Sequence, residues 1–139
     1  MTRIVLVMHE PLGTAFARCA EHVLGSPQSA LHVVDVVADA DVERLSVHLS
    51  GLLRNAPESG SLVLCDLYGA TPFNVAQRAI ALAREHGAKA CLLTGANLNM
   101  ILKALTDPCA DPDVLRDSVR CGAIRGIVDS GAGGPCVAS

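Results

Sequence analysis

Residues 61–74 read SLVLCDLYGATPFN, and this stretch combines a strand, a short loop and the start of a helix. The run 61–65 is almost continuously apolar, which is typical of a strand buried on both faces of a parallel sheet. Thr71 supplies a hydroxyl that can cap a helix, and Pro72 follows it at the first helical position. The stretch therefore predicts a strand that leads through a short loop into a helix.

The same alternation of solid apolar runs and helical stripes extends in both directions along the chain. Further strands are expected at 4–8, 31–37 and 89–94, with a last one at 123–128. The expected helices run from Gly13 to Gly25, from a cap at Asp39 or Asp41 to the loop 55–60, from Thr71 to Gly87, over 97–105, and from Asp111-Pro112 to Gly122. This pattern predicts the α/β class with a doubly wound, mostly parallel sheet, for which 2-1-3-4-5 is a common strand order.

Length and composition describe one small domain with an aliphatic core. The chain has 139 residues, of which 50% are hydrophobic, yet it contains only one Tyr, two Phe and no Trp. A chain of this length buries about two-thirds of its unfolded surface, enough for a core of its own. We expect a single domain over 1–128 and a flexible tail over 129–139, because the tail shows no hydrophobic periodicity.

Charge and cysteine content restrict the partners and the compartment. The formal net charge of −3 comes with no basic cluster, which argues against a nucleic-acid partner. The six cysteines show neither CxxC spacing nor a Cys–His cluster, so we expect free thiols in a reducing cytoplasm and no metal site. No apolar run approaches the ~18 residues of a membrane span, so no membrane insertion is expected, and the run 4–8 is too short for a signal-peptide core.

Two polar side chains follow expected strands at the edge where doubly wound sheets place function. His9 comes directly after the run 4–8, and Asp66 directly after 61–65. In the order 2-1-3-4-5 these strands are neighbours, so imidazole and carboxylate can come within hydrogen-bonding reach. Such a carboxylate fixes the ring tautomer and makes the other nitrogen a metal ligand, a general base or a nucleophile. The alternative is a strand-end histidine satisfied by a loop.

The segment that follows Asp66 is suited to binding an anion. Gly69 and Ala70 allow close approach of the backbone, and the helix start presents free N–H groups at the positive end of its dipole. Thr71 adds a hydroxyl donor. We therefore expect a phosphate-binding segment that comprises Gly69, Ala70, Thr71 and Phe73, whereas the plain alternative is an ordinary capped helix.

Three segments together resemble the IIA domain of the mannose-type (mannose–fructose–sorbose) family of the bacterial phosphoenolpyruvate-dependent sugar phosphotransferase system. They are 4–9 (IVLVMH), 66–74 (DLYGATPFN) and 95–100 (GANLNM). Their order and spacing agree over residues 1–128. The most specific part is the pattern Asp-Leu-aromatic-Gly-small-Ser/Thr-Pro at 66–72.

The resemblance implies a phosphotransferase that works through a phosphohistidine. It implies that His9 accepts a phosphoryl group from the phosphocarrier HPr and passes it to a IIB component for sugar uptake. Asp66 would orient the His9 ring and leave Nε2 as the nucleophile, and the Thr71 hydroxyl would help to hold the phosphate. Family members are cytoplasmic homodimers without a metal or organic cofactor. Their sheet has five strands, and the last, here 123–128, is antiparallel and exchanged between subunits.

The sequence departs from the family pattern beside the histidine. Glu10 stands where a glycine is usual, and its carboxylate would repel an incoming phosphate unless it points away. Thr71 replaces the commoner serine, Ala70 the commoner glycine, and Asn99 a usual proline.

Two other functions remain open at this stage. One is a regulatory phosphoprotein of an incomplete phosphotransferase system, which signals by its phosphorylation state without sugar transport. The other is a receiver-like switch phosphorylated on Asp66. The latter is disfavoured because such switches need an acidic pair after the first strand, where this chain has Met8, His9 and Glu10.

Overall fold

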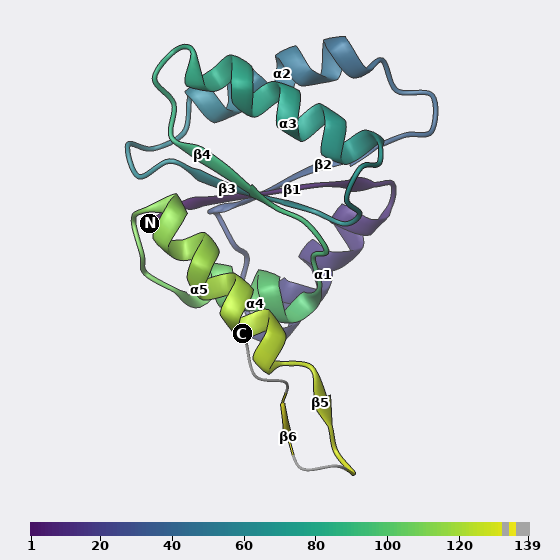
Figure 1. Cartoon of the computed structure of the whole chain (residues 1–139), viewed down its shortest axis with the longest axis vertical. Coiled ribbons are helices and arrows are strands. Elements are labelled where there is room, and N and C mark those ends of the chain that lie inside the picture. Colours follow the sequence, from purple (N-terminus) through teal and green to yellow (C-terminus); the bar gives the residue numbers. More distant parts are fainter. Residues whose placement is uncertain (132–133, 136–139) are drawn as a thin grey trace.

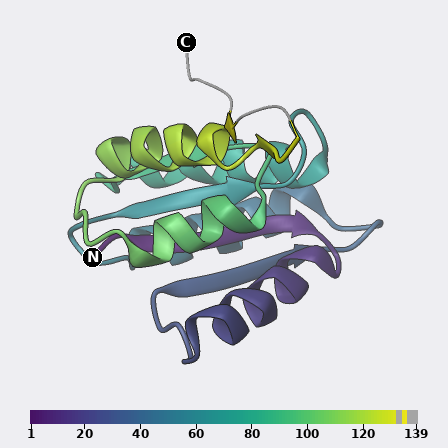
Figure 2. The same ribbon diagram turned by 90° about the horizontal axis from the view of Figure 1, so that it is seen from below.

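Four parallel strands form the central sheet in the computed structural model of the chain, which describes residues 1–131 and 134–135. They lie side by side in the order β2-β1-β3-β4 (Figure 1), and Figure 2 shows their shared direction. The α/β class and the expected order of the first four strands are confirmed, with strand ends within one residue of expectation. In chain order the strands are β1 (Arg3–His9), β2 (Leu31–Val36), β3 (Ser61–Cys65) and β4 (Ala90–Leu93).

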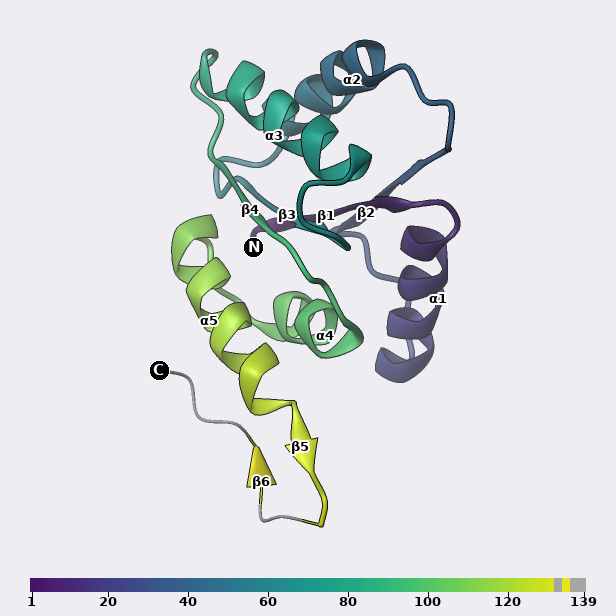
Figure 3. The same ribbon diagram turned by 45° about the vertical axis from the view of Figure 1, so that its right-hand side comes forward.

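Helices cover both faces of this sheet. Helices α2 and α3 lie on one face, and α1, α4 and α5 lie on the other (Figures 1 and 3). In the described ranges no helix is both long and apolar enough to cross a membrane. The helices are α1 (Leu12–Leu24), α2 (Val42–Arg54), α3 (Thr71–Arg84), α4 (Leu98–Thr106) and α5 (Pro112–Arg125).

The double cover explains why β1 is apolar at every position from 4 to 8. Successive side chains of a strand point to opposite faces. Val5 and Val7 pack with the α2 and α3 side, whereas Ile4, Leu6 and Met8 pack with the α1, α4 and α5 side. All five are fully buried. Each such aliphatic side chain contributes about 1.5–3 kcal/mol through burial, which makes β1 the centre of the core.

Several helix boundaries follow the expected capping residues. Gly25 ends α1 in the left-handed conformation with φ of 76°. Asp41, one of the two expected caps, accepts a hydrogen bond from the Arg44 N–H at 3.1 Å at the start of α2. The expectation that Thr71 caps α3 is wrong, because Ala70 holds the extended cap conformation and Thr71 is already helical. The helix begins one residue earlier than expected, with Thr71 as its first residue and Pro72 as its second. Proline is tolerated in the first turn because the N–H that it lacks has no partner within the helix there.

The C-terminal region differs from the expected fifth strand at 123–128. Residues 123–125 form the last turn of α5, and the strand β5 comprises Val128–Asp129. It pairs antiparallel with β6 (Gly134–Pro135) in a hairpin that projects from the domain instead of joining the main sheet (Figure 3). Gly122 does not end α5: it is helical, and a Cβ there would stand at an ordinary contact distance of 3.5 Å from Cγ of Lys103 in α4. The α5 helix continues to Gly126, whose N–H closes the last turn.

The expected tail at 129–139 is described only in part. Residues 129–131 and 134–135 belong to the hairpin and its turn, whereas 132–133 and 136–139 lie outside the described residues. The predicted flexibility of this segment stays a prediction, as does the exchange between subunits of the strand expected at 123–128.

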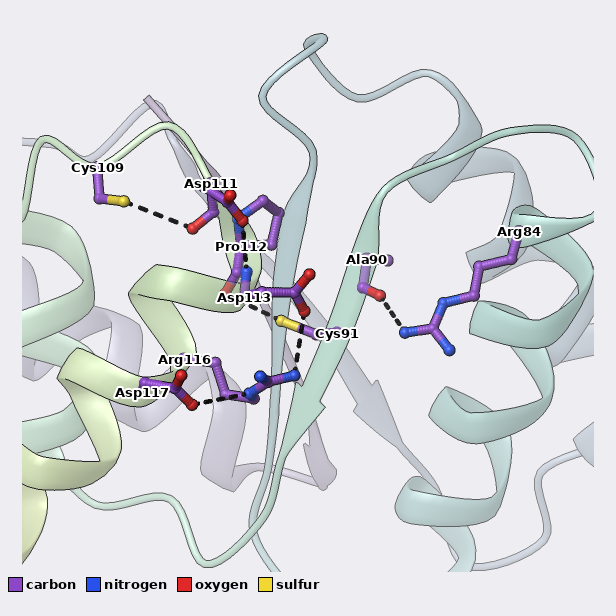
Figure 4. A network of polar contacts seen from close by, with 9 residues as sticks. All are labelled: Arg84, Ala90, Cys91, Cys109, Asp111, Pro112, Asp113, Arg116 and Asp117. Atoms are coloured by element: carbon purple, nitrogen blue, oxygen red, sulfur yellow. Dashed lines mark hydrogen bonds and ion pairs between the residues drawn. The ribbon is translucent and has the colours of Figure 1, made fainter.

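Polar contacts fix α3 and α5 to β4 at the edge of the sheet where the strands begin (Figure 4). The Arg84 guanidinium donates to the Ala90 carbonyl at 2.7 Å, and the Cys91 thiol donates to the Pro112 carbonyl at 3.1 Å. Asp111 caps α5 by accepting from the Asp113 N–H at 2.9 Å. Burial raises the pKa of the Cys91 thiol to about 11, so it packs as a small apolar group. This edge is therefore structural and lies opposite the strand ends that carry His9 and Asp66.

Candidate active site

The structure brings the two predicted strand-end residues together. His9 is the last residue of β1, and Asp66 directly follows β3, the neighbour of β1 in the sheet. The His9 Nδ1 lies 2.7 Å from the Asp66 Oδ2, and the His9 backbone N–H donates to the same oxygen at 3.1 Å. One carboxylate oxygen therefore holds both the ring and the main chain of the histidine.

Hydrogen bonding keeps the Asp66 carboxylate ionised although it is largely covered. Its side chain is 11% exposed, whereas that of His9 is 50% exposed. Burial acts to raise the pKa of Asp66, but the hydrogen bonds from the His9 ring and backbone, a hydrogen bond from the backbone of Asp66 itself and the charge of His9 lower it below its usual value. An ionised acceptor requires a proton on Nδ1 of His9.

This arrangement leaves Nε2 of His9 as the reactive nitrogen. With the proton on Nδ1, the lone pair of the neutral ring lies on Nε2. Nε2 has no hydrogen-bond partner among the described residues, and half of the side chain is open to solvent. The pair is therefore arranged to present one nucleophilic nitrogen whose developing positive charge the carboxylate stabilises.

The segment after Asp66 forms a tight turn into α3. Gly69 has a φ of +81°, a backbone conformation that residues with a Cβ rarely adopt. The Tyr68 and Phe73 rings pack against each other across this turn with centroids 4.8 Å apart. Of the predicted phosphate-binding residues, Gly69 and Ala70 lie in the loop and Thr71 and Phe73 in the first turn of the helix.

The N-terminus of α3 differs from the other helix starts in the described part of the chain. A side chain accepts from the first turn of each of the others: Asp35 for α1, Asp41 for α2, Asn97 for α4 and Asp111 for α5. The α3 cap residue Ala70 has no such side chain, and no described side chain takes its place. Its first N–H groups and the Thr71 hydroxyl are therefore available to an anion.

Sequence reasoning missed Asp35, which lies in β2 beside the site. Its carboxylate accepts from the N–H groups of Gly13 and Thr14 and from the Thr14 hydroxyl. These partners are 21 and 22 positions away in the sequence, so no local pattern reveals them. The one available signal was a carboxylate inside a strand whose other residues, apart from His32, are apolar.

The other histidines do not join the pair. His22, His48 and His86 are exposed on or just after helices, and His32 lies at the start of β2. Within residues 1–131 and 134–135, no three His, Cys, Asp or Glu side chains are grouped to hold a metal ion.

Comparisons with known proteins identify the family and the fold of the chain. The family model described as PTS system fructose IIA component matches residues 3–114. The phosphotransferase component EIIA of Streptococcus agalactiae has 28% identity and a TM-score of 0.80 over 96% of this chain and all of that one. The mannose/sorbose-specific IIA subunit of Enterococcus faecalis shares the fold, with 21% identity and a TM-score of 0.73 over 99% of this chain and 97% of that one. No curated protein sequence matches the chain.

Proposed function

This chain belongs to the family of PTS system fructose IIA components, and from that premise we propose that it carries a phosphoryl group on Nε2 of His9. It accepts the group from the phosphocarrier HPr and passes it to a IIB component for sugar uptake. The observation that carries the proposal is the 2.7 Å contact between the His9 Nδ1 and the Asp66 Oδ2, which directs the lone pair of Nε2 outward.

The chemical step is an in-line transfer between two imidazoles. The Nε2 lone pair attacks the phosphorus of the donor phosphohistidine, a new N–P bond forms, and the bond to the donor nitrogen breaks. The electron pair of that bond stays on the donor ring. Positive charge develops on the His9 ring as the bond forms, and the ionised Asp66 stabilises it through Nδ1–H. Transfer to the IIB component repeats the step with His9 as the leaving group.

The transferred phosphoryl group also needs stabilisation of its negative charge. The uncapped start of α3 supplies backbone N–H groups and the positive end of the helix dipole, and Thr71 supplies a hydroxyl. We assign Gly69, Ala70, Thr71 and Phe73 to this role, with Gly69 forming the turn that lets the backbone approach. Positioning and charge stabilisation are the main demands of phosphoryl transfer, so this role uses only groups of the chain itself.

A receiver-like role for Asp66 is less well supported than transfer through His9. Both oxygens of Asp66 already accept hydrogen bonds, Oδ2 from His9 and Oδ1 from the Leu67 N–H. A carboxylate held in this way is poorly placed to attack a phosphorus atom, whereas Nε2 of His9 is exposed and unengaged by the described residues.

The exposed apolar side chains around His9 suit transient docking of two carriers in turn. Leu12, Val37, Leu67 and Tyr68 follow the ends of β1, β2 and β3 and are 36–76% exposed. We propose that HPr and the IIB component bind over this edge in the cytoplasm, and that the chain works as a homodimer whose last strand, expected at 123–128 and found as β5 at Val128–Asp129, is exchanged.

Incubation with phosphorylated HPr tests the proposal. The wild-type chain is expected to take up an alkali-stable, acid-labile phosphate, and His9→Gln is expected to take up none. His22→Gln is the matched control, because His22 is an exposed helix residue away from the strand ends. Uptake by His9→Gln equal to the wild type, or an acid-stable and alkali-labile phosphate, would show that the phosphoryl group is carried elsewhere.

A further inference from the structure

Asp35 links the second strand to the segment that follows His9. Its Oδ1 accepts from the Gly13 N–H at 2.9 Å, and its Oδ2 accepts from the N–H and the hydroxyl of Thr14. Gly13 is so close to this carboxylate that a Cβ there would lie 2.6 Å from Oδ1. The start of α1 is therefore fixed to β2 through a side chain that is partly buried between them.

The segment that Asp35 fixes is short and begins at the histidine. Only residues 10–12 separate His9 from Gly13. At the strand end, the Glu10 N–H donates to the Val36 carbonyl at 3.0 Å, and Val36 is the residue after Asp35. At the helix end, the Ala15 N–H donates to the Pro11 carbonyl at 3.0 Å. The connection is held at both ends, and Asp35 supplies the long-range contacts at one of them.

Asp35 also occupies the N-terminal N–H groups of α1, which would otherwise be free to bind an anion at this edge of the sheet. Both α1 and α3 begin just after a strand that carries a member of the His9–Asp66 pair. The Asp35 carboxylate occupies the first turn of α1 with an internal negative charge, whereas the first turn of α3 has no side-chain acceptor among the described residues. Of these two helix starts, only that of α3 therefore offers N–H groups to an incoming phosphoryl group without an internal negative charge beside them.

We propose that Asp35 is a positioning residue for phosphoryl transfer at His9. It holds α1 against β2 so that the His9 main chain keeps the place from which the ring and the backbone N–H reach the same oxygen of Asp66. This inference rests on the proposed function of His9 and adds to it a residue that touches neither His9 nor the phosphoryl group.

The test compares transfer rates from phosphorylated HPr with the state of the His9 ring. Asp35→Ala removes the acceptor for three donors, and we expect the rate to fall about tenfold or more, since a misplacement of about 1 Å can cost about 100-fold. Asp35→Asn keeps an oxygen toward Gly13 but turns an NH₂ group toward the Thr14 N–H, and it is expected to restore the rate only in part. The ¹⁵N and ¹H signals of the His9 ring are expected to show a smaller share of the Nδ1–H tautomer in Asp35→Ala, a change that lost stability alone does not produce.

Asp111→Ala is the matched control, because Asp111 also caps a helix but lies at the opposite edge of the sheet (Figure 4). It is expected to keep the wild-type rate and ring signals at a temperature where every variant is folded. If Asp35→Ala does not fold, Thr14→Val removes the hydroxyl donor alone and is expected to slow transfer in the same direction, to a smaller extent.

The outcomes separate this inference from the proposed function. A wild-type chain that is not phosphorylated on His9 overturns both. Normal phosphorylation of the wild type, together with an unchanged rate and unchanged ring signals in Asp35→Ala, overturns the role of Asp35 alone. Equal slowing in Asp111→Ala also overturns it, because the effect would then come from general loss of a helix cap.

Discussion

Replacing Asp66 by Asn changes one oxygen into an NH₂ group and leaves the side-chain shape unchanged. In the wild type three donors point at the carboxylate: the His9 N–H and Nδ1–H at Oδ2, and the Leu67 N–H at Oδ1. An amide offers only one oxygen. If its NH₂ faces Leu67, two donors oppose each other there. If its NH₂ faces His9, it opposes the His9 N–H and favours the tautomer with the proton on Nε2, which blocks the nucleophile.

The size of the effect follows from the loss of a charged acceptor for the His9 Nδ1–H, which occurs in either orientation of the amide. A hydrogen bond to a charged group contributes about 1.5–3 kcal/mol. The ring charge that develops during transfer makes this bond stronger in the transition state than in the ground state, so most of that energy appears in the barrier. At about 1.4 kcal/mol for each factor of ten, Asp66→Asn is expected to slow phosphoryl transfer about 10- to 150-fold.

Rapid-quench measurement of transfer from phosphorylated HPr gives this rate directly. Asp39→Asn is the control for the loss of one negative charge, because Asp39 is an exposed residue that follows β2 at the same edge of the sheet. It is expected to stay within about twofold of the wild type, since an isolated surface charge is largely screened. If the transfer rate of Asp66→Asn also stays within about twofold of the wild-type rate, the proposed role of the carboxylate is refuted.

Three further predictions concern stability. Gly13→Ala forces a shift away from the Asp35 carboxylate and is expected to lower the free energy of unfolding by about 1–3 kcal/mol in urea denaturation; its control Gly51→Ala, where a Cβ meets nothing within 4 Å inside α2, is expected to raise it by about 0.5–1 kcal/mol. Ile101→Ala, at a fully buried position of α4, is expected to cost about 2–5 kcal/mol in the same assay. Folding lowers the pKa of Asp66, so the ionised carboxylate contributes fully to the free energy of unfolding above its unfolded pKa of about 3.9, and this contribution is lost as the pH falls through the lower folded pKa. The difference in free energy of unfolding between the wild type and Asp66→Asn should therefore shrink below about pH 4. A difference that stays constant with pH would contradict the lowered pKa.

The parts of the fold that depend on local pattern could be predicted from the sequence. The run 4–8 indicates a strand with two covered faces, and each of its residues is completely buried in the structure. The pairing of His9 with Asp66 could also be predicted. Local pattern shows where each of the two strands ends, and the common strand order of a doubly wound sheet makes the two strands neighbours.

The parts that depend on contacts between distant elements could not be predicted. Gly122 has the chemistry of a helix stop, yet it is helical here, and α5 packs against α4 and continues past it to Arg125. Asp35 finds its donors on another element. The start of α3 was predicted one residue too late, because a Thr-Pro pair does not fix which of two adjacent residues begins the helix.

The central place of β1 has a consequence for how the chain folds as it leaves the ribosome. During synthesis β1 gains its first partner in the sheet when β2 emerges, but its other edge stays unpaired until Ser61–Cys65 has followed. At about 5–20 residues per second, this delay lasts several seconds. Throughout it, a five-residue segment that later forms the centre of the core is open to association with other nascent chains, and early capture by a chaperone would protect it.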